Sequence, residues 1–205
     1  MDGRERRPDG GAWTRAVLIR TGLGAGAVAA AGAVMGHSRG DDATSLAAAQ
    51  DADADILNFF LLLEYVQEGF YRETVEKAQI DGELLTYAET VAGQEGQHVA
   101  FLEKWLGGRA RARPEVDFED ATGSAQRFRD TAIYLEEAAI AGYIGQGANL
   151  TRKTIREVAT LISAEARQVA WVRDLAGMNP APNAADPARK GDDVVADLRK
   201  RGFLS

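Results

Sequence analysis

Residues 88–106, AETVAGQEGQHVAFLEKWL, hold the pattern that decides the fold. Their apolar side chains recur at steps of three and four positions, which is the period of an α-helix with one buried face. That face also includes a glutamate, and its members are Ala88, Val91, Ala92, Glu95, Val99 and Leu102. Two glycines follow at 107–108, and glycine commonly ends a helix. The stretch predicts a helix over about residues 83–106 with a carboxylate on its buried side.

Three other stretches show the same helical period. They predict helices over about residues 53–78, 124–148 and 154–176, and Ser124 is placed to cap the start of the second of these. Each carries one glutamate within its apolar stripe, and these residues are Glu64, Glu136 and Glu165. From residue 41 onward, no segment alternates between apolar and polar side chains as a strand would. The chain is therefore predicted to be all-α.

The lengths of the connections predict how the helices are arranged. The first and second helices are joined by a few residues around 81–82, and the third and fourth by a few around 149–150. Connections this short favour two antiparallel hairpins. Residues 107–123 lie between the hairpins and are long enough to cross the bundle from end to end. The sequence thus predicts an antiparallel four-helix bundle with one long crossover between the second and third helices.

Four glutamates on four inward helix faces would place like charges together in a low dielectric. Such a group is unfavourable unless a counter-charge is present or the carboxyl groups are protonated. Two divalent cations would supply the counter-charge, and carboxylate oxygens suit iron or manganese. His98 follows Glu95 by one helical turn, so the imidazole projects from the same side and adds a nitrogen ligand. The alternative is a metal-free bundle whose glutamates are protonated or paired with a basic residue such as Arg152 or Arg167.

The chain resembles a family of ferritin-like proteins that includes plant desiccation-related proteins and bacterial exported members. The segments that carry the resemblance are Leu57–Tyr65 with Phe70 and Tyr71, Glu95–His98, Leu135–Glu137 with Tyr143–Gly145, and Glu165–Gln168. The resemblance implies a ferritin-like fold, which agrees with the bundle predicted from the connections. It also implies a metal site whose ligands, by position, are Glu64, Glu95, His98, Glu136 and Glu165.

Two positions of this implied site differ from the others. Gln168 stands where the family pattern places a histidine, and a glutamine carbonyl oxygen is a weaker ligand for iron than an imidazole nitrogen. One or two metal ions are therefore expected, with Gln168 as the weakest member of the ligand set. Glu137 competes with Glu136 for the place on the third helix because both lie within a turn of Ile133 and Ile140, and the resemblance favours Glu136.

The first 40 residues are typical of an export signal. Five arginines precede an uncharged run of small and apolar residues at 21–36, and Ala31-Gly32-Ala33 offers a cleavage site. Residues 14–20 resemble a twin-arginine signal whose second arginine is replaced. The segment is either cleaved or kept as an anchor. We therefore predict an exported protein, secreted or associated with the cell envelope, with an N-terminal segment at 1–40, a bundle at 41–178 and a proline-containing linker with a short helix or tail at 179–205.

Composition limits the function further. The 205 residues include no cysteine, which excludes zinc–thiolate sites and cysteine catalysis. The formal charge of −7 argues against nucleic-acid binding. The expected partners are metal ions, a membrane where the N-terminal segment stays attached, and further copies of the chain.

Two functional classes follow from these observations. The first is a protein that binds iron or manganese in the bundle and reacts with oxygen or peroxide. The second is a metal-free or degenerate bundle with a structural, stress-protection or interaction role, which the substitution at Gln168 favours. Five aromatic residues are interpreted as packed side chains, although a tyrosine close to a metal could assist redox chemistry; they are Trp105, Trp171, Tyr65, Tyr134 and Tyr143.

Overall fold

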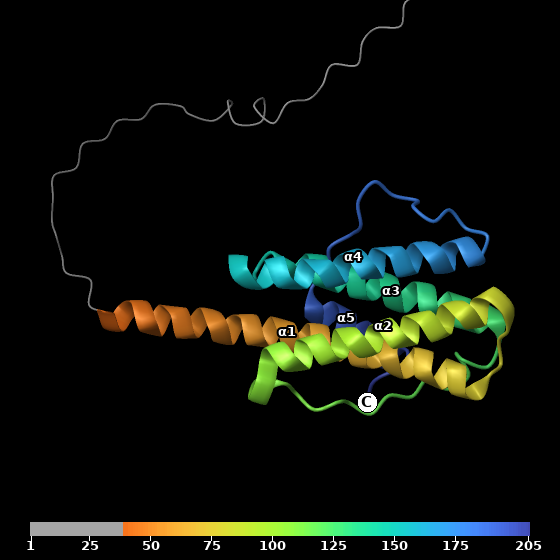
Figure 1. Cartoon of the computed structure of the whole chain (residues 1–205), viewed down its shortest axis with the longest axis horizontal. Coiled ribbons are helices and arrows are strands. Elements are labelled where there is room, and N and C mark those ends of the chain that lie inside the picture. Colours follow the sequence, from red (N-terminus) through yellow and green to blue (C-terminus); the bar gives the residue numbers. More distant parts are fainter. Residues whose placement is uncertain (1–38) are drawn as a thin grey trace, which may run out of the picture. The chain divides into compact units, whose positions relative to one another are not determined.

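The computed structural model describes residues 39–205, and the predicted export signal therefore lies almost wholly outside the described residues. The helices of the described part are α1 (Arg39–Lys77), α2 (Gly82–Leu106), the 3-10 helix η1 (Gly107–Arg109), α3 (Ala125–Gly147), α4 (Arg152–Leu175) and α5 (Gly191–Lys200). Over these residues β-structure is limited to an isolated bridge between Val116 and Leu204. The prediction of an all-α bundle is confirmed (Figure 1).

Helix α1 begins at Arg39, well before the predicted start near Asp53. The added residues include a run of alanines at 47–49, and alanine has the strongest intrinsic helix propensity of all residues. These residues lack a regular apolar stripe, so the periodicity of the sequence does not predict that they are helical. Among the described residues, no helix is both long enough and apolar enough to cross a membrane.

The four long helices form two hairpins, α1 with α2 and α3 with α4, that pack against each other. Helix α1 lies against α3 and helix α2 against α4 (Figure 1). The crossover from α2 to α3 is fixed to α1 by Asn58, whose Nδ2 donates to Arg109 O at 3.0 Å and whose Oδ1 accepts from Arg111 N at 2.7 Å. The two hairpins therefore hold all four inward faces in one shared interior.

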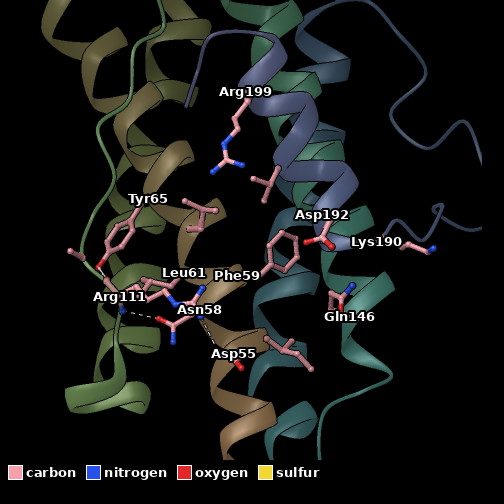
Figure 2. Close-up of a pocket in the computed structure, with 15 residues that line it drawn as sticks. Asp55, Asn58, Phe59, Leu61, Tyr65, Arg111, Gln146, Lys190, Asp192 and Arg199 are labelled. Carbon is pink, nitrogen blue, oxygen red and sulfur yellow. Dashed lines mark hydrogen bonds and ion pairs between the residues drawn. The ribbon is translucent and has the colours of Figure 1, made fainter. Parts of the chain in front are cut away.

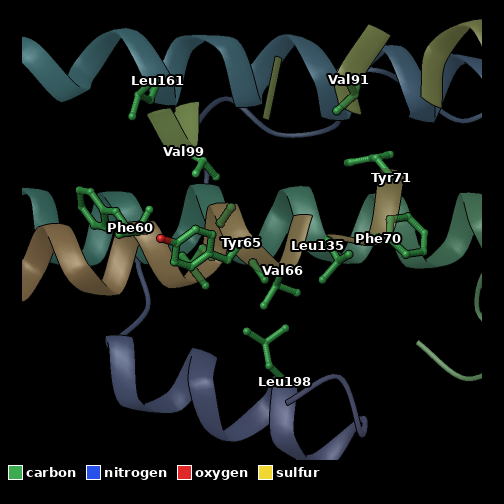
Figure 3. Packing of buried hydrophobic residues seen from close by; sticks show 14 of the residues in the cluster. Phe60, Tyr65, Val66, Phe70, Tyr71, Val91, Val99, Leu135, Leu161 and Leu198 are labelled. Atoms are coloured by element: carbon green, nitrogen blue, oxygen red, sulfur yellow. The ribbon is translucent and has the colours of Figure 1, made fainter. Parts of the chain in front are cut away.

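The interior of the bundle is apolar on both sides of a polar middle. Figure 3 shows part of this packing, including Val66 of α1, Leu135 of α3 and Leu198 of α5. Phe70 and Phe128 stack with their planes 7° apart, and Phe118 of the crossover packs edge to face on Phe70. Burying side chains of this size contributes about 1.5 to 3 kcal/mol each. The apolar layers thus stabilise a bundle whose centre is occupied by acids.

The C-terminal segment packs on the bundle, and the predicted short helix is present as α5. Its Val194 and Leu198 are buried, as is Phe203 just beyond it. The linker also touches α3, because Arg189 N donates to Ala141 O at 2.8 Å. A Cβ atom at Gly145 would lie 1.8 Å from Arg189 O, so only glycine allows this close approach.

Candidate metal centre

Each long helix contributes one fully buried glutamate to the middle of the bundle. Glu64, Glu95, Glu136 and Glu165 all have 0% exposure, as their positions within the apolar stripes predict. His98 and Gln168, one turn after Glu95 and Glu165, are also buried. The structure therefore brings all six sequence-predicted residues into the interior.

His98 lies at the centre of a tight group. Its Nδ1 is 3.2 Å from Glu95 Oε2, 3.2 Å from Glu165 Oε1 and 3.3 Å from Glu64 Oε2. The donor atoms of Glu64, Glu95, His98 and Glu165 all lie within 4.8 Å of one another. One nitrogen and three carboxylates converge there from helices α1, α2 and α4. We call these four residues the His98 cluster.

Glu136 lies beside the His98 cluster and is connected to it by Gln67. The Nε2 atom of Gln67 donates to Glu165 Oε2 at 2.9 Å and to Glu136 Oε2 at 3.1 Å. Sequence reasoning missed Gln67, which is buried three positions after Glu64 on the same apolar stripe. That spacing was the available signal, since a polar residue on an apolar stripe needs a buried partner.

Gln168 acts in this structure as a hydrogen-bond donor to the acids. Its Nε2 donates to Glu95 Oε1 at 2.8 Å and to Gln94 Oε1 at 3.0 Å. Its Oε1 has no hydrogen-bond partner although it is buried. The amide therefore supports Glu95 and leaves one free oxygen in the interior.

Two tyrosines hold the carboxylates of α1 and α3 in a reciprocal arrangement. Tyr71 of α1 donates to Glu136 of α3, and Tyr143 of α3 donates to Glu64 of α1. Each tyrosine follows the glutamate of its own helix by two turns. Both rings are fully buried. Tyr143 was interpreted from sequence as a packed aromatic, and its contact with Glu64 is an additional role.

The shared interior changes the protonation of these groups. Burial, followed by repulsion from Glu165, raises the pKa of Glu64 and raises that of Glu95 and Glu136 well above the usual range. Burial alone would lower the pKa of His98, but the close carboxylates of Glu165, Glu64 and Glu95 outweigh it and raise that pKa. Without another counter-charge, Glu64, Glu95, Glu136 and His98 therefore hold their protons to a higher pH than usual.

The residues present fit a divalent cation. Glu64 Oε2 and Glu165 Oε1 are buried and have no hydrogen-bond partner, and both face His98 Nδ1. A carboxylate oxygen left without a partner in a low dielectric is unfavourable, and a cation would satisfy both oxygens together. A donor set of one imidazole and several carboxylates suits iron or manganese.

The structure also answers two questions that the sequence left open: which glutamate of α3 faces the interior, and whether an arginine of α4 reaches the buried acids. Glu136 is buried, whereas Glu137 is exposed and pairs with Arg173, so the interior residue of α3 is Glu136. Arg152 and Arg167, the counter-charges of the metal-free alternative, are both exposed, and Arg167 donates to Ser163 O. Neither arginine can pair with the buried glutamates from these outward positions of α4, so the metal-free alternative is left with protonated carboxyl groups.

Comparison with known proteins agrees with this arrangement of helices and acids. The family model described as a ferritin-like domain matches residues 52–178. The chain belongs to the ferritin-like domain family. No curated protein matches the sequence. The match covers α1 from residue 52 onward and the whole of α2, α3 and α4, and so includes every residue of the centre.

A cavity of about 600 Å³ lies elsewhere on this ferritin-like domain, between α1, the crossover and α5. Figure 2 shows Phe59 on its apolar side and Arg111, Lys190 and Arg199 among the charged residues around it. Arg111 pairs there with Asp55 at 2.9 Å. None of the six predicted site residues lines this cavity, so it is separate from the buried acids.

Proposed function

We propose that this ferritin-like domain binds iron or manganese in the bundle core and acts outside the cytoplasm in redox chemistry with oxygen or peroxide. The observation that carries the proposal is the position of His98 Nδ1 among three carboxylates, two of which have an unpartnered buried oxygen. Membership of the family makes a metal site in this place plausible, but the fold alone does not decide it.

In this proposal the His98 cluster holds the principal ion. Glu64, Glu95 and Glu165 supply negative charge and His98 supplies the nitrogen. Any second metal position would use Glu136 and Gln168. It is weaker than the first, because the amide oxygen of Gln168 replaces an imidazole nitrogen. A bound redox metal supplies one-electron chemistry that the side chains lack.

The chain's own residues orient the ligands and exclude water. Tyr143 and Tyr71 each fix one carboxylate, of Glu64 and Glu136 respectively, and so limit its rotation. Gln168 does the same for Glu95 by donating to its Oε1. Outer hydrogen bonds of this kind commonly change metal affinity by about 10- to 100-fold. The apolar layers on both sides keep the donor atoms dry, which strengthens every charge interaction among them.

A second candidate function is a metal-free bundle with a structural, stress-protection or interaction role. The observation that favours it is the pair of amides, since Gln67 and Gln168 together donate to Glu95, Glu136 and Glu165. Protonated carboxyl groups could complete such a network without a cation. In that case His98 would serve only as the central hydrogen-bond donor.

Elemental analysis of protein purified without chelator distinguishes the two. We expect close to one equivalent of iron or manganese per chain, and its loss in His98→Ala. Glu137→Gln is the matched control, because Glu137 is the exposed neighbour of the buried Glu136. Metal below a tenth of an equivalent, or unchanged metal in His98→Ala, would favour the metal-free function.

The proposed location is tested separately. Expressing the full chain in a bacterial host and fractionating the cells should place the protein in the envelope or the medium. Replacing Arg15 and Arg20 by lysine in the twin-arginine-like segment should retain it in the cytoplasm if that route is used. Cytoplasmic full-length wild-type protein would contradict the export proposal and leave the metal proposal intact.

A further inference from the structure

Helix α1 carries a second row of apolar side chains on the side opposite Glu64. Its members recur at steps of three and four positions, and they are Ile56, Phe59, Leu62 and Val66. Val66 has 1% exposure and faces Leu198 of α5 (Figure 3). The other three side chains of the row are only half-buried. Helix α5 therefore covers one end of this row and leaves the other end partly uncovered.

The partly uncovered end of the row forms an apolar wall of the cavity between α1, the crossover and α5. Ile56, Phe59 and Leu62 span about 9 Å along α1, since each residue of a helix adds about 1.5 Å. Val195 of α5 adds apolar surface to the same cavity. The volume of about 600 Å³ lies within the range of about 300 to 1,000 Å³ that is usual for small-molecule sites. The cavity is therefore large enough for a small amphipathic molecule.

The ring of Phe59 is held in this wall by close packing against two glycines. A Cβ atom at Gly142 of α3 would lie 2.9 Å from Phe59 Cζ, and one at Gly191 of α5 would lie 3.4 Å from the ring. The absence of a side chain at both positions lets α3 and α5 approach the ring, which leaves it little room to turn away. The apolar wall is thus formed before any ligand binds, and this lowers the entropy cost of binding.

The rim of the cavity is more basic than the chain as a whole. Three basic residues stand there against two acidic ones, whereas the whole chain has a formal charge of −7. These residues are Arg111, Lys190, Arg199, Asp55 and Asp192. Arg111 already pairs with Asp55 at 2.9 Å, and Lys190 points away from the cavity in Figure 2. Arg199 remains, and its guanidinium reaches into the space between α5 and α1 (Figure 2).

Arg199 is available to bind an anion. Its Nε donates to Ser205 O in a long bond of 3.4 Å. Over residues 39–205, no aspartate or glutamate side chain pairs with it, and Asp197 of the same helix pairs with Arg189 instead. Asp192 lies two helical turns before Arg199, about 10 Å along α5, so its carboxylate does not compete for the guanidinium. The planar fork of a guanidinium matches the two oxygens of a carboxylate.

We propose that this cavity binds a free fatty acid of medium chain length, with its carboxylate on Arg199 and its hydrocarbon chain along Ile56, Phe59 and Leu62. A compact anion such as phosphate would leave the apolar wall in contact with water. A neutral hydrocarbon would cover the wall but leave Arg199 without a partner. A fatty acid satisfies both parts of the cavity at once. The proposal is independent of the metal centre, because none of the six site residues lines this cavity.

Isothermal titration of the full-length protein with monomeric decanoate near neutral pH tests the proposal. We expect one decanoate per chain, with a dissociation constant of about 0.1 mM. Affinity should rise about 10-fold from octanoate to decanoate, because two further methylene groups are buried. Decanol should bind at least about 10-fold more weakly than decanoate, because it lacks the charge-assisted hydrogen bonds. Absence of saturable decanoate binding, or equal affinity for octanoate and decanoate, would overturn the proposal.

A charge variant tests the role of Arg199. Arg199→Gln should weaken decanoate binding at least about 10-fold and leave decanol binding unchanged. Lys200→Gln is the matched control, because Lys200 is the next cation of α5, is exposed and does not line the cavity. It should bind both ligands as the wild type does. Unchanged decanoate affinity in Arg199→Gln, or an equal loss in Lys200→Gln, would contradict the assigned site.

Two variants that fill the cavity test its location. Val195→Trp fills it from α5, and Ala112→Trp fills it from the crossover. Both should abolish decanoate binding, and thermal unfolding checks that each variant is folded. Ala112 is exposed, so its replacement leaves the core intact even where Val195→Trp is unstable. Full decanoate affinity in Ala112→Trp would overturn the proposal, as would binding to anionic phospholipid vesicles without binding of monomeric decanoate. Either result leaves the metal proposal untouched.

Discussion

The two hairpins of the bundle offer the same carboxylates to the centre but different partners for them. The α1–α2 hairpin carries Glu64, Glu95 and His98, and the α3–α4 hairpin carries Glu136, Glu165 and Gln168. His98 and Gln168 each follow the glutamate of their own helix by three positions. The glutamate–tyrosine contacts are reciprocal between the hairpins. One histidine against one glutamine is therefore the main chemical difference. If the centre binds metal as proposed, this difference should give its two halves unequal affinities.

The imidazole of His98 lies beside Glu64, Glu95 and Glu165, whereas Glu136 accepts from the neutral amide of Gln67, a residue of α1. Gln67 connects Glu136 with Glu165, and Gln168 supports Glu95. Amide donors stabilise carboxylates without supplying a charge, so they leave less reason for a second cation. The account therefore expects one strong metal position and at most one weak one.

The largest expected effect comes from removing the only imidazole of the cluster. His98→Ala should weaken iron or manganese binding by about 100-fold or more, because it removes a direct ligand and even supporting residues change affinity by about 10- to 100-fold. Gln168→Ala should weaken it by about 10-fold, the lower end of the range for a supporting residue. Competition with a fluorescent chelator measures both. Equal losses in the two variants would break the comparison between the hairpins.

The next effect concerns the stability of the metal-free protein. The raised pKa of Glu64, Glu95 and Glu136 contributes stability that is fully present below their unfolded pKa and is lost as pH rises through the folded pKa. Chelator-treated protein should therefore unfold at a lower temperature at about pH 8 than at about pH 5, the window that spans the raised carboxyl pKa values. The affinity for metal should instead increase as pH rises, because the ligands must be deprotonated to bind the ion.

Glu64→Gln sharpens that expectation because it removes one buried charge and keeps an oxygen for Tyr143. The metal-free variant should be more stable than wild type by roughly 1 to 2 kcal/mol at neutral pH, with a smaller pH dependence. Thermal unfolding with chelator present measures it. A variant that is less stable than wild type at every pH would show that Glu64 is ionised and well paired without metal.

Restoring the histidine that the family pattern contains should make the two hairpins alike. Gln168→His should strengthen binding of a second ion by roughly 10-fold, since it replaces an amide oxygen by a nitrogen ligand. Metal content should rise toward two ions per chain. Gln168→Asn is the matched control because it shortens the amide without adding a nitrogen ligand. No rise in Gln168→His would indicate that Gln67, rather than Gln168, prevents the second ion from binding.

The smallest expected effect concerns the reciprocal tyrosine–glutamate hydrogen bonds, which both hairpins contain. Tyr143→Phe removes one buried hydrogen bond to a carboxylate and should lower the free energy of unfolding by about 1 to 2 kcal/mol. Tyr71→Phe removes the corresponding bond to Glu136 and also the contact with the Tyr87 hydroxyl, and should lower it by up to about 1 kcal/mol more. Urea denaturation of chelator-treated protein measures both. A difference between them much larger than 1 kcal/mol would show that the reciprocal contacts are not equivalent.

Helical period was enough to predict the bundle and to predict that the four glutamates lie inside it. Each long helix has one apolar stripe, so an acid within that stripe faces the interior whatever the details of packing. Period could not distinguish Glu136 from Glu137, because both lie within reach of the same stripe, and burial separated them. The roles of Gln67 and Tyr71 depend on contacts between α1 and helices distant in sequence, which a one-helix pattern does not contain. The start of α1 was missed because alanines extend a helix without marking a face.

The most direct test of the account is anaerobic isothermal titration of the chelator-treated full chain with ferrous ion, repeated with manganous ion in air. The account predicts one strong binding event per chain, assigned to the His98 cluster, with any second event at least roughly 10-fold weaker. Two equal events would contradict the difference between the hairpins. No binding of either ion would contradict the metal site itself and favour the metal-free bundle.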